Sequence, residues 1–363
     1  MTGRKICFFN TAVRWGGGEK WHFDMAAGLV ALGSNVCAVA GSRGRFREKL
    51  VRSGIPFFTV DISNLSFLNI FKIRRVRRFL IDNKIDTLII SLPSDLKVAG
   101  PAARMAGTRT VIYRRGSAIP IRDSLLNRYL FKNCVTSIIA NSKETKRTIL
   151  QNNPDIFDSG KIELIYNGLD LEEWDNRSSH PLFNPENEDV VIGTAGRLEI
   201  EKGHNRLIDL AVILKKRGLK FKLLIAGSGR LRKKLERYAA KREVSDRVVF
   251  MGFIEEMKSF MDSIDIFLLS SLWEGFGYVI IESMASSTPV VAFDLSSTGE
   301  IIEDGKTGFL VPPGDISCMA EKVTDLIYDN DLRKKTGQNG RTVVEKQFRV
   351  EQALEKLLSA IYS

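Results

Sequence analysis

Two glutamates that flank a glycine-containing turn are the residues of this chain best suited to do chemistry. The segment Glu274-Gly-Phe-Gly-Tyr-Val-Ile-Ile-Glu282 follows an apolar, strand-like run and leads into a helical pattern. Glycines in such a turn let a ligand approach the backbone, and the start of a helix favours anions and hydroxyl-rich ligands. Glu282, further into the helix, is suited to accept hydrogen bonds from a ribose. Glutamates near helix starts are also common caps, but the pair around this turn favours a binding site.

Two cations follow another strand-like run. Arg197 lies in Gly-Arg-Leu directly after that run, and Lys202 comes shortly afterwards. Two fixed cations can neutralise negative charge on a bound ligand. The alternative is a solvent-facing pair at a helix start. Two further strand-like runs end at glycines, Gly227 and Gly252, and these turns are also candidates to lie beside a nucleotide.

The first half of the chain has a glycine turn of its own. Gly17, Gly18 and Glu19 follow the first strand-like run and open a helical pattern. Amides at such a helix start can hold phosphates. The turn is neither a Walker loop, because no Lys-Ser/Thr follows, nor a dinucleotide fingerprint, because Gly-x-Gly-x-x-Gly is absent. Later, Arg114 and Arg115 end a strand-like run and suit an anionic acceptor or donor.

The spacing of apolar runs predicts the fold. Short runs alternate with helical patterns in two successive series, which is typical of parallel sheets covered by helices. We therefore expect an α/β protein of two doubly wound, Rossmann-like domains that face each other across a cleft. The predicted parts are a first domain (1–178), a linker (179–188), a second domain (189–345) and a C-terminal helix (346–363) that could cross back to the first domain. The predicted strands are 5–9, 35–40, 56–60, 86–91, 110–113, 136–140 and 162–165, then 189–195, 220–226, 247–251, 265–270, 289–293 and 308–311.

Positive charge is concentrated in the first half. Residues 1–180 hold 28 Lys and Arg against 16 Asp and Glu, whereas residues 181–363 hold 26 against 27. This asymmetry suggests an anionic partner, which could be a membrane surface, an acidic acceptor or nucleic acid. In 69–80, Ile73, Val76, Phe79 and Leu80 share one helical face among basic residues. That helix is either core only, or it also presents Phe67, Leu68, Ile70 and Phe71 to a membrane.

Composition excludes several classes of protein. Four scattered cysteines and three histidines make a zinc site or a disulfide framework improbable, and suggest a reducing cytosol. No apolar run reaches the length of a membrane span, and no secretory signal is visible. Asp329-Asn-Asp331 follows a helical pattern rather than a strand, so we interpret it as a helix cap and expect no metal. We expect a cytoplasmic protein, with a peripheral position on the inner face of the cytoplasmic membrane left open.

The Glu274–Glu282 segment resembles the E-x7-E motif of retaining GT-B glycosyltransferases of family 4. The resemblance implies that Arg197 and Lys202 hold the donor diphosphate and that Glu282 binds the ribose. Glu274 would position the donor sugar, together with the loop amides of Phe276, Gly277, Tyr278 and Val279. Gly17, Gly18, Gly227 and Gly252 would line the donor, while Glu19, Arg114 and Arg115 would lie on the sugar or acceptor side. Many members carry a histidine where this chain has Arg114-Arg115-Gly-Ser, which is a departure from the family pattern.

The same resemblance implies the reaction, with residues 1–178 as the acceptor-side domain and residues 189–345 as the nucleotide-sugar-binding domain. The expected donor is a UDP- or GDP-sugar, no cofactor is required, and the acceptor is a glycan or a lipid-linked molecule such as a lipopolysaccharide or surface-polysaccharide intermediate. Alternatives on this scaffold are a sugar-nucleotide epimerase, a phosphorylase, or a non-catalytic sugar-nucleotide-binding protein. A nucleic-acid-binding protein is disfavoured because no RNA- or DNA-recognition motif accompanies the basic half.

Overall fold

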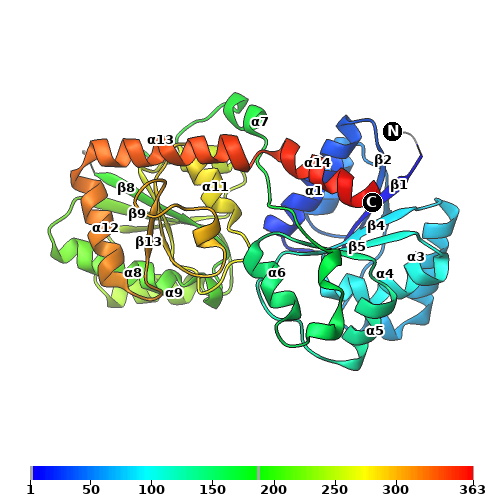
Figure 1. Cartoon of the computed structure of the whole chain (residues 1–363). Coiled ribbons are helices and arrows are strands. Elements are labelled where there is room, and N and C mark those ends of the chain that lie inside the picture. Colours follow the sequence, from blue (N-terminus) through cyan, green and yellow to red (C-terminus); the bar gives the residue numbers. More distant parts are fainter. Residues whose placement is uncertain (1–2, 186–188, 363) are drawn as a thin grey trace. The chain divides into compact units, whose positions relative to one another are not determined.

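The computed structural model describes residues 3–185 and 189–362, and the chain divides into two compact units (Figure 1). The N-terminal unit comprises Met1–Asn167 together with Ala353–Ser363, and the C-terminal unit comprises Gly168–Gln352. The last part of the predicted linker, residues 186–188, lies outside the described residues. Each unit is an α/β layer structure built on one parallel sheet, which is the predicted fold class.

The N-terminal unit contains a seven-stranded parallel sheet in the order β3-β2-β1-β4-β5-β6-β7. The order runs outward in both directions from the neighbours β1 and β4, so the loops after these two strands diverge at a topological switch point. The central strands are buried on both faces, as parallel strands between helical layers must be. The strands are β1 (Lys5–Asn10), β2 (Asn35–Ala40), β3 (Phe57–Thr59), β4 (Thr87–Ile90), β5 (Thr110–Arg115), β6 (Ser137–Ala140) and β7 (Ile162–Leu164).

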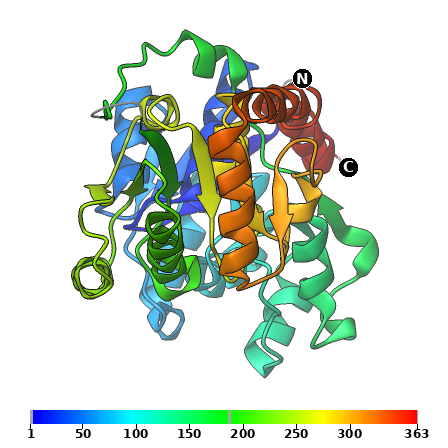
Figure 2. The same ribbon diagram turned by 90° about the vertical axis from the view of Figure 1, so that its left-hand side faces the viewer.

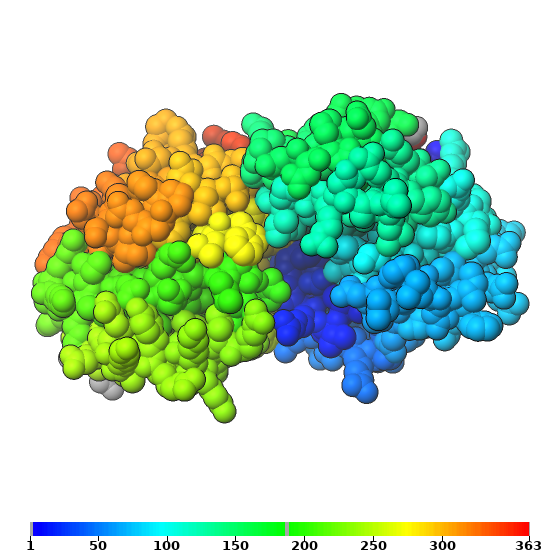
Figure 3. All heavy atoms as spheres, turned by 90° about the horizontal axis from the view of Figure 1, so that it is seen from below, coloured from blue at the N-terminus to red at the C-terminus, as the bar shows by residue number. Residues whose placement is uncertain are grey.

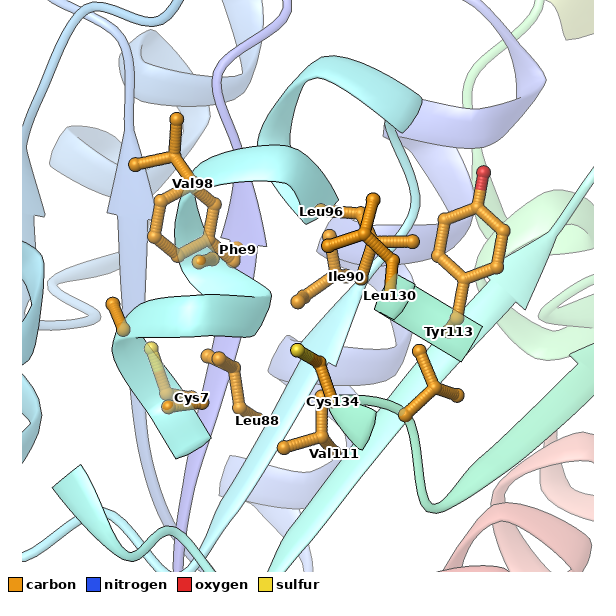
Figure 4. Packing of buried hydrophobic residues seen from close by; sticks show 14 of the residues in the cluster. Cys7, Phe9, Leu88, Ile90, Leu96, Val98, Val111, Tyr113, Leu130 and Cys134 are labelled. Carbon is orange, nitrogen blue, oxygen red and sulfur yellow. The ribbon is translucent and has the colours of Figure 1, made fainter. Parts of the chain in front are cut away.

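Helices cover both faces of this sheet. On one face, α4 and α5 pack against the strands, and Figure 4 shows Phe9, Ile90, Leu96 and Leu130 among the side chains of that core. On the other face, α1 packs against the last helix, where Leu354 approaches Gly28 so closely that a Cβ there would overlap it. The helices are α1 (Gly17–Ala31), α2 (Arg45–Ser53), η1 (Ser66–Leu68), α3 (Ile70–Asp82), α4 (Pro93–Ala106), α5 (Leu125–Asn133), α6 (Lys143–Leu150), η2 (Pro154–Ile156), η3 (Ser159–Lys161) and α14 (Val350–Tyr362).

The C-terminal unit repeats this design with six parallel strands in the order β10-β9-β8-β11-β12-β13. Figure 2 faces this unit, in which α8 (green) and α12 (orange) lie side by side. The strands are β8 (Val190–Ala195), β9 (Phe221–Ala226), β10 (Val248–Gly252), β11 (Ile266–Leu269), β12 (Val290–Phe293) and β13 (Phe309–Val311). The helices are α7 (Leu171–Asn176), η4 (Ile200–Lys202), α8 (His204–Lys216), α9 (Arg232–Lys241), α10 (Met257–Met261), α11 (Tyr278–Ala285), η5 (Thr298–Glu300), α12 (Ile316–Tyr328) and α13 (Asn330–Gln347).

The division between the units differs from the predicted boundary. Residues up to 178 were expected in the first domain, whereas α7 belongs to the C-terminal unit. The indole of Trp174 donates to Ser286 Oγ at 3.3 Å, and the Asp175 carboxylate pairs with Arg341 at 2.7 Å. These side-chain contacts join residues more than a hundred positions apart, which explains why composition alone did not reveal them.

The basic helix α3 buries the predicted face. Ile73, Val76 and Leu80 are buried and Phe79 is half-buried against the core. Leu68, Ile70 and Phe71 are exposed, as the membrane-facing interpretation requires. The expectation for Phe67 was wrong: its ring packs against the core. Lys97 Nζ lies 5.6 Å from the ring centre, so the aromatic face is also covered by a cation.

Candidate functional site

The strongest constellation lies at the switch point of the C-terminal sheet. β8 has both β9 and β11 as neighbours, so the loops after β8 and β11 leave the sheet in diverging directions. Open parallel sheets bind ligands at this point, beyond the carboxyl ends of the strands. The loop after β8 carries Arg197 and Lys202, and the loop after β11 carries Glu274. The sheet order therefore brings together the residues that the sequence analysis selected from distant segments.

Lys202 and Glu274 are in direct contact. The Lys202 ammonium lies 2.5 Å from Glu274 Oε1, and Ser271 Oγ donates to the same oxygen at 2.6 Å. Ser270 Oγ donates to the Lys202 carbonyl at 2.9 Å, which fixes the lysine backbone to the end of β11. Glu274 is buried and Lys202 is largely buried. The pair is thus preorganised, with its charges held where bulk water cannot screen them fully.

Arg197 lies apart from this pair. Its guanidinium contacts Glu201 at 3.0 Å, four residues along the chain, and the side chain is 51% exposed. An exposed ion pair of this kind contributes little to stability, so the arginine can exchange its partner for a phosphate at small cost. The Glu201 carbonyl accepts from the Leu272 amide at 2.7 Å, which ties this loop to the β11 loop.

The Gly-Phe-Gly turn is held by packing at its aromatic residues. Gly277 precedes α11 with a φ of +87°, a left-handed conformation that only glycine adopts without strain. The Phe276 ring packs edge-on against Phe348, and the Tyr278 hydroxyl donates to the Gly168 carbonyl at 2.7 Å. The side chains of Phe276 and Tyr278 therefore position the turn. Glu282 is buried within α11, and Val279 is half-buried at its start.

The glycine turns after β8, β9 and β10 touch one another. The Gly227 amide donates to the Gly252 carbonyl at 2.6 Å. Gly227 has a φ of +138°, and a Cβ there would lie 1.9 Å from the Gly196 carbonyl oxygen. A side chain at this position is excluded by both conformation and contact. Gly227 thus supports the loop that begins with Arg197, and two of the predicted donor-side glycines, Gly227 and Gly252, share one end of this sheet.

In the N-terminal unit, the glycine turn meets a buried arginine. α1 begins at Gly17, and a Cβ on Gly18 would lie 3.6 Å from an Arg114 guanidinium nitrogen. Arg114 is buried, donates to Asn167 Oδ1 at 2.9 Å and lies 4.9 Å above the Trp21 ring. The structure thus joins the turn to Arg114.

The two remaining acceptor-side candidates, Glu19 and Arg115, are half-buried. Arg115 donates to the Ile119 carbonyl at 2.6 Å, so its guanidinium is fixed by the loop that follows β5. Beneath the turn, burial and the nearby Arg114 charge lower the pKa of His22 to about 3, which keeps this imidazole neutral.

A buried carboxyl group that was not predicted from the sequence lies at the switch point of this sheet. Asp95, in the first turn of α4, accepts from the Thr11 amide at 2.9 Å and from the Thr11 hydroxyl at 2.6 Å. These bonds connect the loops after β4 and β1. Burial raises the pKa of Asp95 to about 7, partly offset by the Thr11 bonds, and the Glu19 charge raises it further. An acid in a first helical turn looks like an ordinary cap in sequence, so only the fold reveals this arrangement.

Metal ligands do not cluster in the part of the chain that the structure describes, where no group of three or more His, Cys, Asp or Glu could hold an ion. The Asp329-Asn-Asp331 segment follows α12, and the Asp329 carboxylate accepts from the Leu332 amide at 2.8 Å. This confirms its interpretation as a helix cap. No helix within residues 3–185 and 189–362 combines the length and apolarity needed to cross a membrane.

Comparison with known families finds a match for each of the two units. The model for glycosyl transferases group 1 matches residues 175–343, and the model for glycosyltransferase family 4 matches residues 15–173. Together they span both units, and each model follows one of the two sheets. The chain belongs to this glycosyltransferase family. The two Rossmann-like α/β sheets expected from the sequence are confirmed, and solved structures of GT-B glycosyltransferases share this fold.

Individual relatives share part of the chain. A capsular polysaccharide biosynthesis glycosyltransferase, CapM of Staphylococcus aureus, is 31% identical over 62% of this chain and 61% of its own length. A Campylobacter jejuni N-acetylgalactosaminyltransferase acting on a diphospho-undecaprenol-linked sugar is 29% identical over 69% of this chain and 66% of its own. The chain thus spans about three fifths of the first curated relative's length. The structure of Anabaena HepE with UDP and glucose superposes with a TM-score of 0.84, covering 99% of this chain and 100% of that one at 21% identity, which establishes the fold.

Proposed function

We propose that this protein is a retaining glycosyltransferase that moves a sugar from a nucleoside-diphosphate sugar to an acceptor hydroxyl. The observation that carries the proposal is the Lys202–Glu274 contact at the switch point of the C-terminal sheet. A buried cation and carboxylate at this place can hold a phosphate and a sugar hydroxyl side by side. The UDP and glucose bound to the related HepE structure make UDP-sugars the first donors to test, with GDP-sugars second.

The reaction assigns a role to each residue. The bond between the sugar C1 and the diphosphate oxygen breaks, and a bond from C1 to the acceptor oxygen forms on the same face. The acceptor proton passes to the leaving diphosphate oxygen, so no protein base is required. Arg197 and Lys202 stabilise the negative charge that develops on that diphosphate. Glu274 orients the sugar, Glu282 binds the ribose, and the turn at Gly277 presents the start of α11 to the phosphates.

The acceptor is assigned to a chemical class. The printed name of the Campylobacter relative describes a diphospho-undecaprenol-linked substrate, and the CapM name refers to capsular polysaccharide. We therefore infer a glycan or lipid-linked acceptor that carries negative charge, at the cytoplasmic side of a membrane. Arg114, Arg115 and Glu19 are the residues of the N-terminal unit that we assign to the sugar or acceptor side. No metal is assigned to the reaction, because two cationic side chains, Arg197 and Lys202, are assigned to neutralise the diphosphate.

The test is a transfer assay with stereochemical analysis. The purified protein is incubated with UDP- and GDP-sugars and with undecaprenyl-linked saccharides, and the new linkage is examined by proton NMR. Transfer with an unchanged anomeric configuration is the expected result. Transfer with inversion would refute the retaining mechanism. Conversion of the donor to its epimer without an acceptor, or donor binding without any turnover, would refute the transferase proposal and favour an epimerase or a sugar-nucleotide-binding protein.

A further inference from the structure

One side of the N-terminal unit combines strong positive charge with exposed apolar side chains. Residues 62–122 hold twelve Lys and Arg but only three Asp and Glu. Of those three acids, Asp95 is buried and Asp86 accepts from the Lys5 amide within the fold. This segment therefore carries most of the net charge of the whole chain. In Figure 3 its blue-to-cyan residues lie on the face of the N-terminal unit that is turned towards the viewer.

The charge is concentrated on the outer side of α3. Arg74, Arg75, Arg77 and Arg78 are all exposed, and none forms an ion pair with another residue that the structure describes. Arg77 donates to the Met105 carbonyl at 3.1 Å, and Arg75 lies 5.0 Å above the Phe58 ring. Arg75 and Arg77 are thus anchored by neutral partners, and within the described residues no ion pair offsets the positive charge of the four guanidinium groups. A surface on which the positive charge of the arginines is not neutralised favours an anionic partner.

An apolar patch of four exposed side chains lies beside these arginines. Phe71 is 75% exposed and Leu68 is 72% exposed, and Leu65 and Ile70 are exposed as well. The backbone that carries this apolar patch is fixed, because the Asn69 side chain caps α3 by accepting hydrogen bonds from the Phe71 and Lys72 amides. Below it, buried Ser66 accepts from the Ser63 amide at 2.9 Å. Four large apolar side chains are thus exposed to water on the first turn of α3 and the segment before it, both of which are fixed by hydrogen bonds.

Helical spacing places an exposed aromatic ring and three of the arginines on the same side of α3. Phe71, Arg74, Arg75 and Arg78 follow the spacing i, i+3, i+4 and i+7, so they share one stripe of α3, opposite the buried Ile73, Val76 and Leu80. A stripe that begins with an aromatic ring and continues with arginines suits the boundary between headgroups and acyl chains. A soluble polyanion would satisfy the arginines, but it would leave Phe71 and Leu68 in water.

We propose that α3 and the preceding loop dock this protein onto an anionic phospholipid surface, with Phe71 and Leu68 inserted among the lipids and the arginines on the headgroup phosphates. This inference deepens the proposed function, because it places a transferase for lipid-linked acceptors at the membrane that holds them. Docking itself uses none of the donor residues. It can therefore be tested without a sugar nucleotide.

The experiment is co-sedimentation of the full chain with vesicles, in the absence of donor and acceptor. Wild type should bind vesicles that contain phosphatidylglycerol, bind pure phosphatidylcholine weakly, and detach as salt rises. A cation near an anionic leaflet strengthens binding about fivefold, so Arg74→Glu with Arg78→Glu should weaken binding at least about 25-fold. The matched control is Lys334→Glu with Lys335→Glu, an exposed pair on α13 with the same change in charge, which should bind as wild type.

A second pair tests insertion. Phe71→Ser should weaken vesicle binding, whereas Tyr328→Ser on α12, which removes an equally exposed ring (75%), should not. The proposal is overturned if wild type does not bind anionic vesicles. It is also overturned if the Arg74→Glu/Arg78→Glu variant binds vesicles as well as its Lys334→Glu/Lys335→Glu control. If Phe71→Ser binds as wild type and a soluble polyanion displaces the protein, the surface is a polyanion site instead. Nucleotide binding by the same preparations, measured in solution, shows separately whether the proposed transferase function stands.

Discussion

The Lys202 ammonium and the Glu274 carboxylate lie 2.5 Å apart although 72 residues separate them in the chain. The contact exists because β8 and β11 are neighbours in the sheet while their following loops diverge. Ser271 adds a hydrogen bond to the same carboxylate oxygen. The pair is therefore the point from which the chemistry of the C-terminal unit can be tested.

Replacing Glu274 by glutamine should abolish most of the transfer. The amide keeps the shape of the side chain but loses the charge that holds Lys202 and orients the sugar. We expect kcat to fall on the order of 10²–10³-fold, as when a preorganised transition-state contact is removed. Ser271→Ala keeps the ion pair and loses one hydrogen bond, so its loss should stay within about tenfold. Steady-state kinetics of a correctly folded Glu274→Gln variant with near-wild-type kcat would contradict the assigned role.

Arg197→Ala should weaken binding of a nucleoside diphosphate selectively. A charge-assisted hydrogen bond contributes about 1.5–3 kcal/mol, which corresponds to a roughly tenfold to hundredfold change in Kd. The uncharged nucleoside should bind wild type and variant alike, because it lacks the phosphates. Calorimetric titration with both ligands measures this difference. Equal weakening for nucleoside and diphosphate would mean that Arg197 acts on the fold of the loop rather than on the phosphates.

Gly227→Ala should destabilise the C-terminal unit more than a comparable change elsewhere. Its Cβ would overlap the Gly196 carbonyl oxygen, whereas a Cβ at Gly218, also at positive φ, would meet no atom within 4 Å. The Gly218→Ala control should cost about 1–2 kcal/mol from its left-handed conformation alone. Overlap should add a further 1–3 kcal/mol, roughly, at Gly227. The melting temperatures of the two variants test whether Gly227→Ala is the less stable one. Equal decreases in melting temperature would refute the close packing between the loops that follow β8 and β9.

The stability of the N-terminal unit should depend on the ionisation of Asp95. Its folded pKa of about 7 lies above the ordinary value of 3.8, so the folded state binds more protons between these values. Wild type should therefore lose stability as pH rises from about 4 to 7, by at most about 1.4 kcal/mol per pH unit. Asp95→Asn can keep both Thr11 contacts without a charge, so it should lack this slope. The free energy of unfolding of wild type and Asp95→Asn, measured with denaturant at several pH values, tests this prediction. If the two free energies depend on pH in the same way, Asp95 is not the group responsible.

Much of this fold was predictable because its signals are local. Each of the thirteen predicted strands coincides with an observed strand to within a residue or two, since apolar runs between helices leave few alternatives to buried parallel strands. The turn at Gly277 and its two glutamates were found in the same way, because all three lie in one short segment. The placement of Arg197, Lys202 and Glu274 at one sheet end followed from the alternation of strands and helices.

The rest depends on contacts between distant segments. The partnership of Asp95 with Thr11 spans 84 residues, and nothing in either local sequence distinguishes it from a helix cap. α7 joins the C-terminal unit through Trp174 and Asp175, whose partners lie far along the chain. Phe67 could not be told from its exposed neighbour Leu68, because the side that a short turn buries is set by the helix packed beneath it.

The most direct test of the central claim, that the C-terminal unit binds the donor nucleotide with Glu282 on the ribose, is a binding cycle. Calorimetry would compare wild type and Glu282→Ala, each with a nucleoside diphosphate and with its 2′,3′-dideoxy analogue, after thermal melts confirm folding. We predict that removing either the carboxylate or the hydroxyls weakens binding, and that removing both weakens it no further, because they form one interaction. Additive losses, or no nucleoside diphosphate bound by folded wild type, would contradict the account.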